Sequence, residues 1–224
     1  MKNKKGFTLT EILLAVMIVG LIGIALASLT RAAAREAGVG RSKIMLRNHL
    51  SSFMRTLRGD LAKASRVSYV INGATCNTGG ALLLRIHTNT DQTGAKIISD
   101  QGQETILYCH KCSTAAATFP PVMPSGSYRG GTIYRKVLSS YNSSATCSSG
   151  YMTAANAVLS NVKYIPASGS NYPVPLFMVN PYALGGTTGN SMNSIINVKL
   201  ITELDSRPVV NDVIEETFAV PTGF

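Results

Sequence analysis

The fold of this chain is decided by residues 4–31, which read KKGFTLTEILLAVMIVGLIGIALASLTR. No charged residue occurs between Ile12 and Thr30. At about 1.5 Å per residue, an apolar helix of this length spans a hydrocarbon layer of roughly 30 Å. The stretch therefore predicts a transmembrane helix over residues 7–30, preceded by a short basic segment at residues 1–6.

A cleaved secretory signal is the competing interpretation of this segment, because Lys2, Lys4 and Lys5 form a basic start. However, the apolar run exceeds the usual signal core of about 7–15 residues. No convincing small-residue cleavage site closes the run before Arg31, although alanines near its end keep the signal interpretation open. We favour the uncleaved membrane helix.

The rest of the composition is that of a globular protein. The 224 residues are 45% hydrophobic and 14% charged, with four cysteines, which excludes a disordered chain and a dense disulfide miniprotein. Residues 1–66 hold twelve lysines and arginines against three acids, a net charge of +9. Residues 67–224 hold nine against eight, a net charge of +1. The basic excess therefore belongs to the N-terminal part, and basic residues flank the span on both sides.

A second helical pattern follows the span over residues 31–66. Apolar side chains recur there at spacings of three and four, which places them on one face of an amphipathic helix. Gly38 and Gly40 interrupt the pattern and predict a flexible joint or kink. The apolar stripe consists of Leu46, Leu50, Phe53, Leu57, Leu61 and Ala64.

Residues 67–224 predict a β-rich head, because short apolar runs alternate there with loops rich in Gly, Ser, Asn and Pro. The intervening runs 114–131, 139–150 and 167–193 are long and polar, and we expect them to be surface excursions. The expected strands are 81–88, 104–109, 132–138, 161–165, 195–204 and 213–220.

The segment Lys4-Lys5-Gly6-Phe7-Thr8-Leu9-Thr10-Glu11, directly before the apolar helix, resembles the class III leader of type IV prepilins and type II secretion pseudopilins. The resemblance implies cleavage after Gly6 by a prepilin peptidase, N-methylation of Phe7, and pairing of Glu11 with the N-terminus of a neighbouring subunit. It also implies an α+β, pilin-like fold in which a long N-terminal helix packs on an antiparallel β-sheet head. Thr10 departs from the family pattern, which more often has an aliphatic residue there.

The rest of the chain resembles, at the level of pattern, PilW-type minor pilins and the pseudopilin-J family. This implies a structural subunit with one span in the inner membrane and its head in the periplasm, later located in a filament or at the cell surface. Its partners would be the prepilin peptidase, other pilin or pseudopilin subunits, and the inner membrane. The large head with its three excursions favours a minor subunit that initiates or caps a filament, and a major pilin is the alternative.

Glu11 has two interpretations on physical grounds. A carboxylate in an apolar helix costs roughly 2.5–3.5 kcal/mol at the membrane centre and less towards the ends. Glu11 is either an interfacial residue that reaches water, or the partner of the α-amine that cleavage exposes on Phe7 of the neighbouring subunit. Beside the Gly6-Phe7 junction we favour the second interpretation.

The four cysteines are expected to form disulfides, because an even number lies in a part of the chain that the span places outside the cytoplasm. If the first two predicted strands form an antiparallel hairpin, Cys76 lies at the same end as Cys109 and Cys112. We therefore expect Cys76 to pair with one of these CxxC cysteines and Cys147 with the other. A zinc site built on the CxxC motif is the disfavoured alternative, since the second pair lacks this spacing.

No catalytic residue, cofactor or metal site is expected. His49, His87 and His110 lie in separate predicted elements with no nucleophile motif beside them. The glycine-rich residues 185–189 lack the lysine of a phosphate-binding loop. The acidic pairs at 203 and 205 and at 215 and 216 are interpreted as solvated strand edges.

Nucleic-acid binding through the basic helix, as in a DNA-uptake pilin, is an alternative function, because clustered arginines attract phosphate. We disfavour it for two reasons. No aromatic residues interleave with the arginines, and the anionic lipids of the nearby membrane would attract them equally.

Overall fold

The computed structural model of the chain describes residues 8–68, 80–93, 97, 103–112, 128–165, 174–180, 193–204 and 209–221. The chain divides into two compact units, Met1–Ser42 and Lys43–Phe224. We call the second unit the head. It contains the last part of helix α1 and the strands of one eight-stranded sheet.

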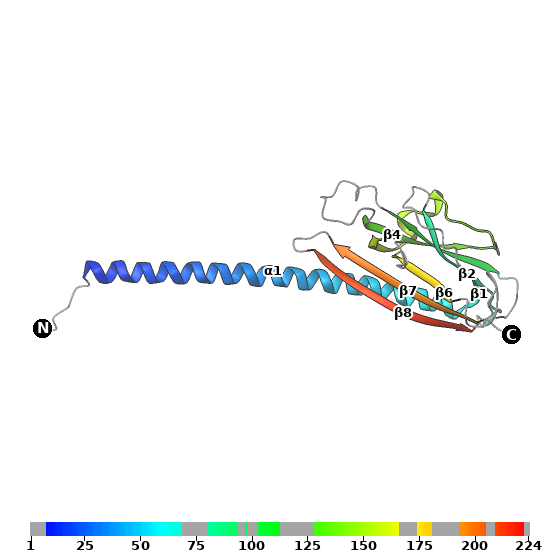
Figure 1. Cartoon of the computed structure of the whole chain (residues 1–224), viewed down its shortest axis with the longest axis horizontal. Coiled ribbons are helices and arrows are strands. Elements are labelled where there is room, and N and C mark those ends of the chain that lie inside the picture. The colour runs from blue at the N-terminus through cyan, green and yellow to red at the C-terminus, as the bar shows by residue number, and fades with distance from the viewer. Residues whose placement is uncertain are drawn as a thin grey trace. The chain divides into compact units, whose positions relative to one another are not determined.

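Helix α1 extends over Leu9–Ala62 (Figure 1). It continues through Gly38 and Gly40 without a break, and the flexible joint or kink expected there stays a prediction. A glycine costs only about 1 kcal/mol relative to alanine in a helix interior, and good helix formers surround both positions. The helix ends four residues earlier than predicted, because residues 64–68 pair with the sheet as a strand.

The predicted apolar stripe is the face of α1 that the head buries. Leu46, Leu50, Phe53, Leu57 and Leu61 are each less than 5% exposed. Ala64 is also buried, but it lies in the first strand and not on the helix. Two further residues of this face, Met54 and Asp60, are buried as well, and the stripe analysis did not include them.

All strand pairs are antiparallel, in the order β1-β2-β3-β4-β5-β7-β6, with β8 paired to β7. Since β8 pairs with the full length of β7, β5 and β6 share the other edge of β7. The strands are β1 (Ala64–Ser68), β2 (Ala81–Thr88), β3 (Glu104–Lys111), β4 (Tyr128–Leu138), β5 (Ala157–Tyr164), β6 (Leu176–Asn180), β7 (Asn193–Leu204) and β8 (Val210–Pro221).

Each of the six predicted strands falls within a strand of the structure or overlaps one. Strands β1 and β6 were missed. Strand β6 lies within the run 167–193, which was expected to be a surface excursion, so that expectation is wrong for residues 176–180. Both missed strands are short, with five residues each.

The sheet is covered on both faces, which explains why β2 is buried along almost its whole length. Leu84, Ile86, Ile106 and Tyr108 join the stripe of α1 in the main core. On the opposite face, a smaller core of Leu82, Leu107, Cys109 and Ala145 lies beneath residues 139–151, which we call the strap. The strap includes the short 3-10 helix η2 (Ser149–Tyr151), and a second one, η3 (Ala154–Asn156), precedes β5. The predicted α+β architecture is confirmed.

Candidate functional site

The start of α1 is organised by Thr8 and Glu11. The Glu11 carboxylate oxygen Oε2 accepts hydrogen bonds from the Thr8 backbone N–H and from the Thr8 hydroxyl, both at 3.0 Å. In return, the Glu11 backbone N–H donates to the Thr8 hydroxyl oxygen at 3.4 Å. This is a capping box, in which residues at the N-cap and N3 positions satisfy each other's free N–H groups.

The capping box positions the Glu11 carboxylate towards the N-terminal end of the helix. Within the described residues, its second oxygen, Oε1, accepts no hydrogen bond. The box does not depend on residues 1–6, because its backbone donor is the amide that joins residue 7 to Thr8. Our sequence analysis missed this arrangement, although the T-x-x-E pattern ahead of an apolar run is its known signal.

The rest of the described chain does not bury the apolar part of α1. One window of the helix has a mean hydropathy of 2.8 and none of it is buried, so α1 is long and apolar enough to cross a membrane. The hydroxyls near the end of the span are satisfied within the helix itself. Ser28 Oγ donates to the Ala25 carbonyl at 2.7 Å, and Thr30 Oγ1 donates to the Leu26 carbonyl at 3.0 Å. Between Ile12 and Thr30, no side-chain hydroxyl therefore needs water as a partner.

Gly6, Phe7 and Cys76 lie outside the described residues, so the structure does not test the positions predicted for them. Glu11 and the other three cysteines are described.

A buried polar cluster fastens α1 to the sheet. Arg135 on β4 donates through Nε and Nη2 to the two Asp60 carboxylate oxygens, both at 2.7 Å. The Tyr108 hydroxyl donates to Asp60 Oδ2 at 2.5 Å. Burial, together with the Asp60 carboxylate, raises the pKa of Tyr108, and the hydrogen bonds to Asp60 raise the pKa of Arg135. The hydroxyl therefore stays protonated and the guanidinium stays charged.

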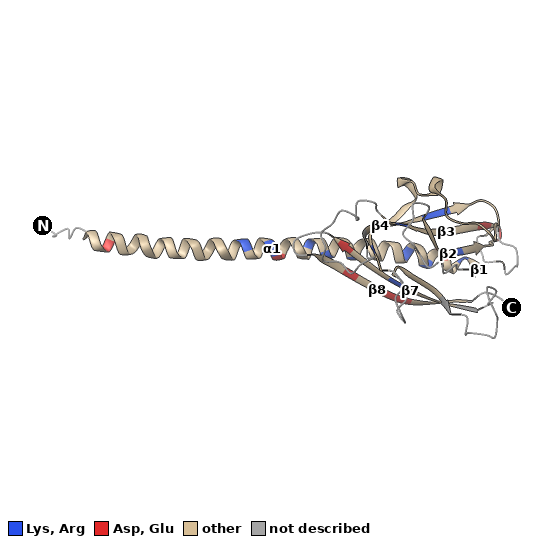
Figure 2. Cartoon of the chain, turned by 45° about the horizontal axis from the view of Figure 1, so that its top comes forward, with Lys and Arg blue, Asp and Glu red and all other residues tan. Residues whose placement is uncertain are grey.

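Two arginines of α1 pair with acids of β8. Figure 2 colours the basic positions of the helix blue and the acidic positions of the strand red. Arg47 lies 3.5 Å from Asp212, and Arg58 lies 2.5 Å from Glu216. Arg58 also lies over the ring of Phe218, 5.9 Å from its centroid. Both arginine side chains remain mostly exposed, at 60% for Arg47 and 63% for Arg58, so these are surface ion pairs.

The interpretation of the acidic pairs as solvated edges is wrong for two residues. Glu216 pairs with Arg58, and Glu203 is 3% exposed and lies 2.9 Å from Lys163 Nζ. Strand β8 meets α1 through the Arg58–Glu216 ion pair and β7 pairs with β5, and the sequence does not reveal either neighbour.

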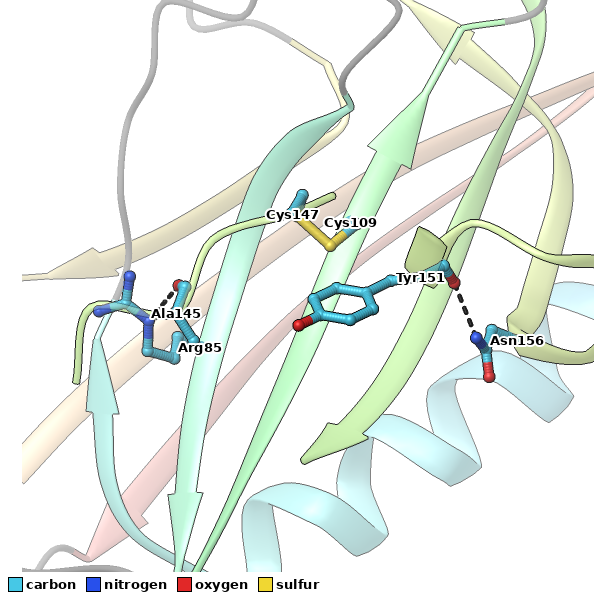
Figure 3. The surroundings of a disulfide bond; sticks show 6 residues. All are labelled: Arg85, Cys109, Ala145, Cys147, Tyr151 and Asn156. Carbon is cyan, nitrogen blue, oxygen red and sulfur yellow. Dashed lines mark hydrogen bonds between the residues drawn. A yellow bond between two sulfur atoms is a disulfide. The ribbon is translucent and has the colours of Figure 1, made fainter. Parts of the chain in front are cut away.

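The strap is held on the sheet by a disulfide between Cys109 and Cys147, which Figure 3 shows above the ring of Tyr151. This bond is one of the pairings that the sequence analysis left open. Arg85 Nε donates to the Ala145 carbonyl at 3.0 Å, and Arg85 Nη1 donates to the Ser143 carbonyl. The polar run 139–150 lies at the surface as predicted, because Ala145 is its only buried residue, but these contacts fasten it to the sheet.

Cys112 is also disulfide-bonded. Cys109 and Cys112 are therefore both engaged in disulfides in this structure, whereas a zinc site would require them as thiolates. No group of three or more potential metal-ligating side chains occurs among the described residues.

The three histidines are not brought together. His49 is exposed on α1, His87 lies opposite Thr105, and His110 lies opposite Ala81 at the other end of the β2–β3 ladder. Burial, and then the charges of Arg85 and Arg66, lower the pKa of His87 to about 4. Burial alone lowers the pKa of His110 to about 4, and its ring stacks on Tyr164.

Comparison with known families gives one match. Residues 1–27 match the prokaryotic N-terminal methylation motif. The match covers the leader segment and most of the apolar run, and it supports a protein of the pilin or pseudopilin type. No curated protein and no solved structure matches the chain significantly.

The motif region contains both the predicted leader junction and the capping box of α1. Pilin-type proteins with this motif are structural, are processed by a prepilin peptidase, and assemble with other pilins. For this chain, the anchoring of an N-terminal apolar helix in the inner membrane is consistent with both the motif and α1.

Proposed function

We propose that this chain is a minor pilin-like structural subunit that initiates or caps a type IV pilus or a type II secretion pseudopilus. The observation that carries the proposal is the methylation motif at residues 1–27 directly joined to an unburied apolar helix. Such a helix requires either lipid or the helices of neighbouring subunits to cover it. Lipid would cover the helix while the subunit is in the membrane, and helices of neighbouring subunits would cover it in the filament.

Processing would proceed between Gly6 and Phe7, followed by N-methylation of Phe7. The peptidase would cut on the cytoplasmic side while residues 7–30 remain in the membrane, with the head in the periplasm. Intact mass of the membrane-bound protein tests this step. The wild type should begin at Phe7, and Gly6→Ala should accumulate as unprocessed precursor. A wild-type chain in filaments that retains Met1 would contradict the proposal.

Glu11 would pair with the α-amine of a neighbouring subunit. The support is its geometry, because the capping box directs the carboxylate towards the helix start and leaves Oε1 without a hydrogen bond in the described residues. In a helical bundle that has left the lipid, this pair would neutralise two buried charges.

Three variants separate the capping role of Glu11 from the pairing role. Glu11→Ala removes both, Glu11→Gln keeps a side chain that completes a capping box but removes the charge, and Thr8→Val removes the cap but keeps the charge. We expect Glu11→Ala and Glu11→Gln to be processed but lost from sheared filaments, and Thr8→Val to be incorporated. Normal incorporation of Glu11→Gln would reduce Glu11 to a helix cap.

The minor role rests on the size of the head. Every copy in a homopolymer would have to accommodate this head around the same helical core, whereas a few copies at a tip would not. Quantitative mass spectrometry of sheared filaments tests this part. Trace amounts, with filaments lost on deletion of the gene, are the expected result, and a dominant amount would identify a major pilin instead.

A DNA-uptake role has less support. Arg47 and Arg58, which the basic pattern would assign to phosphate contacts, are paired with Asp212 and Glu216. The β-rich part of the chain is nearly neutral in sequence.

A further inference from the structure

Two arginines follow the apolar part of α1 without a counter-charge. Arg31 and Arg35 are exposed, and neither forms an ion pair within the described residues. The nearest acid in sequence, Glu36, is five residues from Arg31 and adjacent to Arg35. Neither spacing brings two side chains together on a helix, where only residues three or four apart are neighbours. Both guanidinium groups therefore point outward uncompensated.

The length of the span places these arginines at a membrane surface. Arg31 follows Glu11 by twenty residues, which corresponds to about 30 Å of helix and equals the thickness of a hydrocarbon core. Because Ser28 and Thr30 donate to carbonyls of their own helix, the apolar surface continues up to Arg31. With Glu11 at one boundary, Arg31 lies at headgroup level on the other side.

Arg31 and Arg35 also share one face of α1, because they are four residues apart, one above the other and about 6 Å along the axis. This separation keeps both side chains within the headgroup layer. By contrast, Arg47 and Arg58 of the head are compensated by Asp212 and Glu216. Within the described residues, the exposed Arg41 and Arg55 of α1 also form no ion pair, so it is the position beside the span that distinguishes Arg31 and Arg35.

We propose that Arg31 and Arg35 together bind the phosphate group of an anionic phospholipid in the leaflet on the head side of the membrane. This inference rests on the membrane topology of the proposed function. A planar guanidinium donates paired N–H groups to phosphate oxygens, and two of them on one helix face surround one headgroup. Basic residues on this flank run against the usual positive-inside bias, so a lipid partner gives them a role that orientation does not.

The bound lipid holds the subunit at a fixed depth while it waits in the membrane. It is released when the helix leaves the lipid for the filament, where other subunits replace the headgroups around this part of α1.

The test uses the mature full-length protein in nanodiscs of phosphatidylcholine with a minor share of phosphatidylglycerol. Native mass spectrometry of the released protein measures which lipid stays bound. We expect the wild type to prefer phosphatidylglycerol by roughly five-fold per arginine. The double variant Arg31→Gln/Arg35→Gln should lose this preference. Arg55→Gln is the matched control, because Arg55 is an exposed arginine of α1 that belongs to the head, and it should keep the preference.

Equal lipid preference in the wild type and in Arg31→Gln/Arg35→Gln would overturn the proposal, as would an equal loss in Arg55→Gln. A duplex oligonucleotide that displaces the lipid from the wild type would also overturn it, and would identify a general polyanion site. Processing at residue 7 and incorporation into filaments are measured separately. Lipid preference in a chain that is never incorporated would therefore refute the filament role and leave the lipid site standing.

Discussion

Replacing Asp60 by alanine is the perturbation that tests how α1 is fastened to the head. The Asp60 side chain is 10% exposed, and its carboxylate accepts two hydrogen bonds from Arg135 and one from Tyr108. Removing one partner from a buried ion pair costs about 3–5 kcal/mol. Arg135 remains 27% exposed and regains some hydration, which argues for the lower end. The Tyr108 hydroxyl is fully buried and regains none, which adds about 1–3 kcal/mol. We expect a total loss of about 4 kcal/mol.

The assay is reversible unfolding of the head, Lys43–Phe224, followed by circular dichroism. For a domain of this size, about 4 kcal/mol corresponds to a fall in Tm of roughly 8–16 °C. Tyr108→Phe removes the hydroxyl alone and should cost about 1 kcal/mol. Glu104→Ala, at an exposed position that starts β3, is the control and should stay within about 0.5 kcal/mol of the wild type.

A double-mutant cycle with Arg135→Ala isolates the pair itself. We expect the double variant Asp60→Ala/Arg135→Ala to be more stable than the sum of the single losses predicts, with a coupling of at least about 1 kcal/mol. Additive losses, or an Asp60→Ala variant as stable as Glu104→Ala, would refute the assignment of this cluster as the main polar link between helix and sheet.

Three further predictions concern the head. Cys109→Ser/Cys147→Ser should lower the free energy of unfolding by about 2–4 kcal/mol in non-reducing denaturant titrations, because the bond closes a loop of 38 residues; no change would show that the strap is held by packing alone. The pKa of His110 is lowered to about 4, so the unfolded chain binds a proton near pH 6.5 that the folded chain does not. Stability should therefore fall from pH 6.5 to pH 4, on the order of 3 kcal/mol, and a His110→Phe variant should show a shallower profile. A Cβ on Gly131 would clash with His110 Nε2. Gly131→Ala should therefore lower the free energy of unfolding by about 1–3 kcal/mol in thermal unfolding. Gly59→Ala is the control, because the space around Gly59 is open, and it should be neutral or stabilising.

The sequence by itself determined the features that depend on neighbouring residues along the chain. The apolar run up to Thr30 predicts a membrane helix from length and charge alone, and the stripe from Leu46 to Leu61 predicts the buried face from its period. Strand β2 was predicted with its correct bounds, and the hairpin of β2 with β3 is confirmed. These patterns are local, so no knowledge of the rest of the fold was needed to recognise them.

Only the tertiary structure decided which polar groups meet. Asp60 lies on the apolar face of α1, and its partners are 48 and 75 residues further along the chain. The strap is a polar surface loop, as its sequence predicts, but only the structure shows that Arg85 and a disulfide hold it against the sheet. A buried charge is stable only when its partners are in place. Those partners come together through the order of strands in the sheet, which periodicity along the chain does not encode.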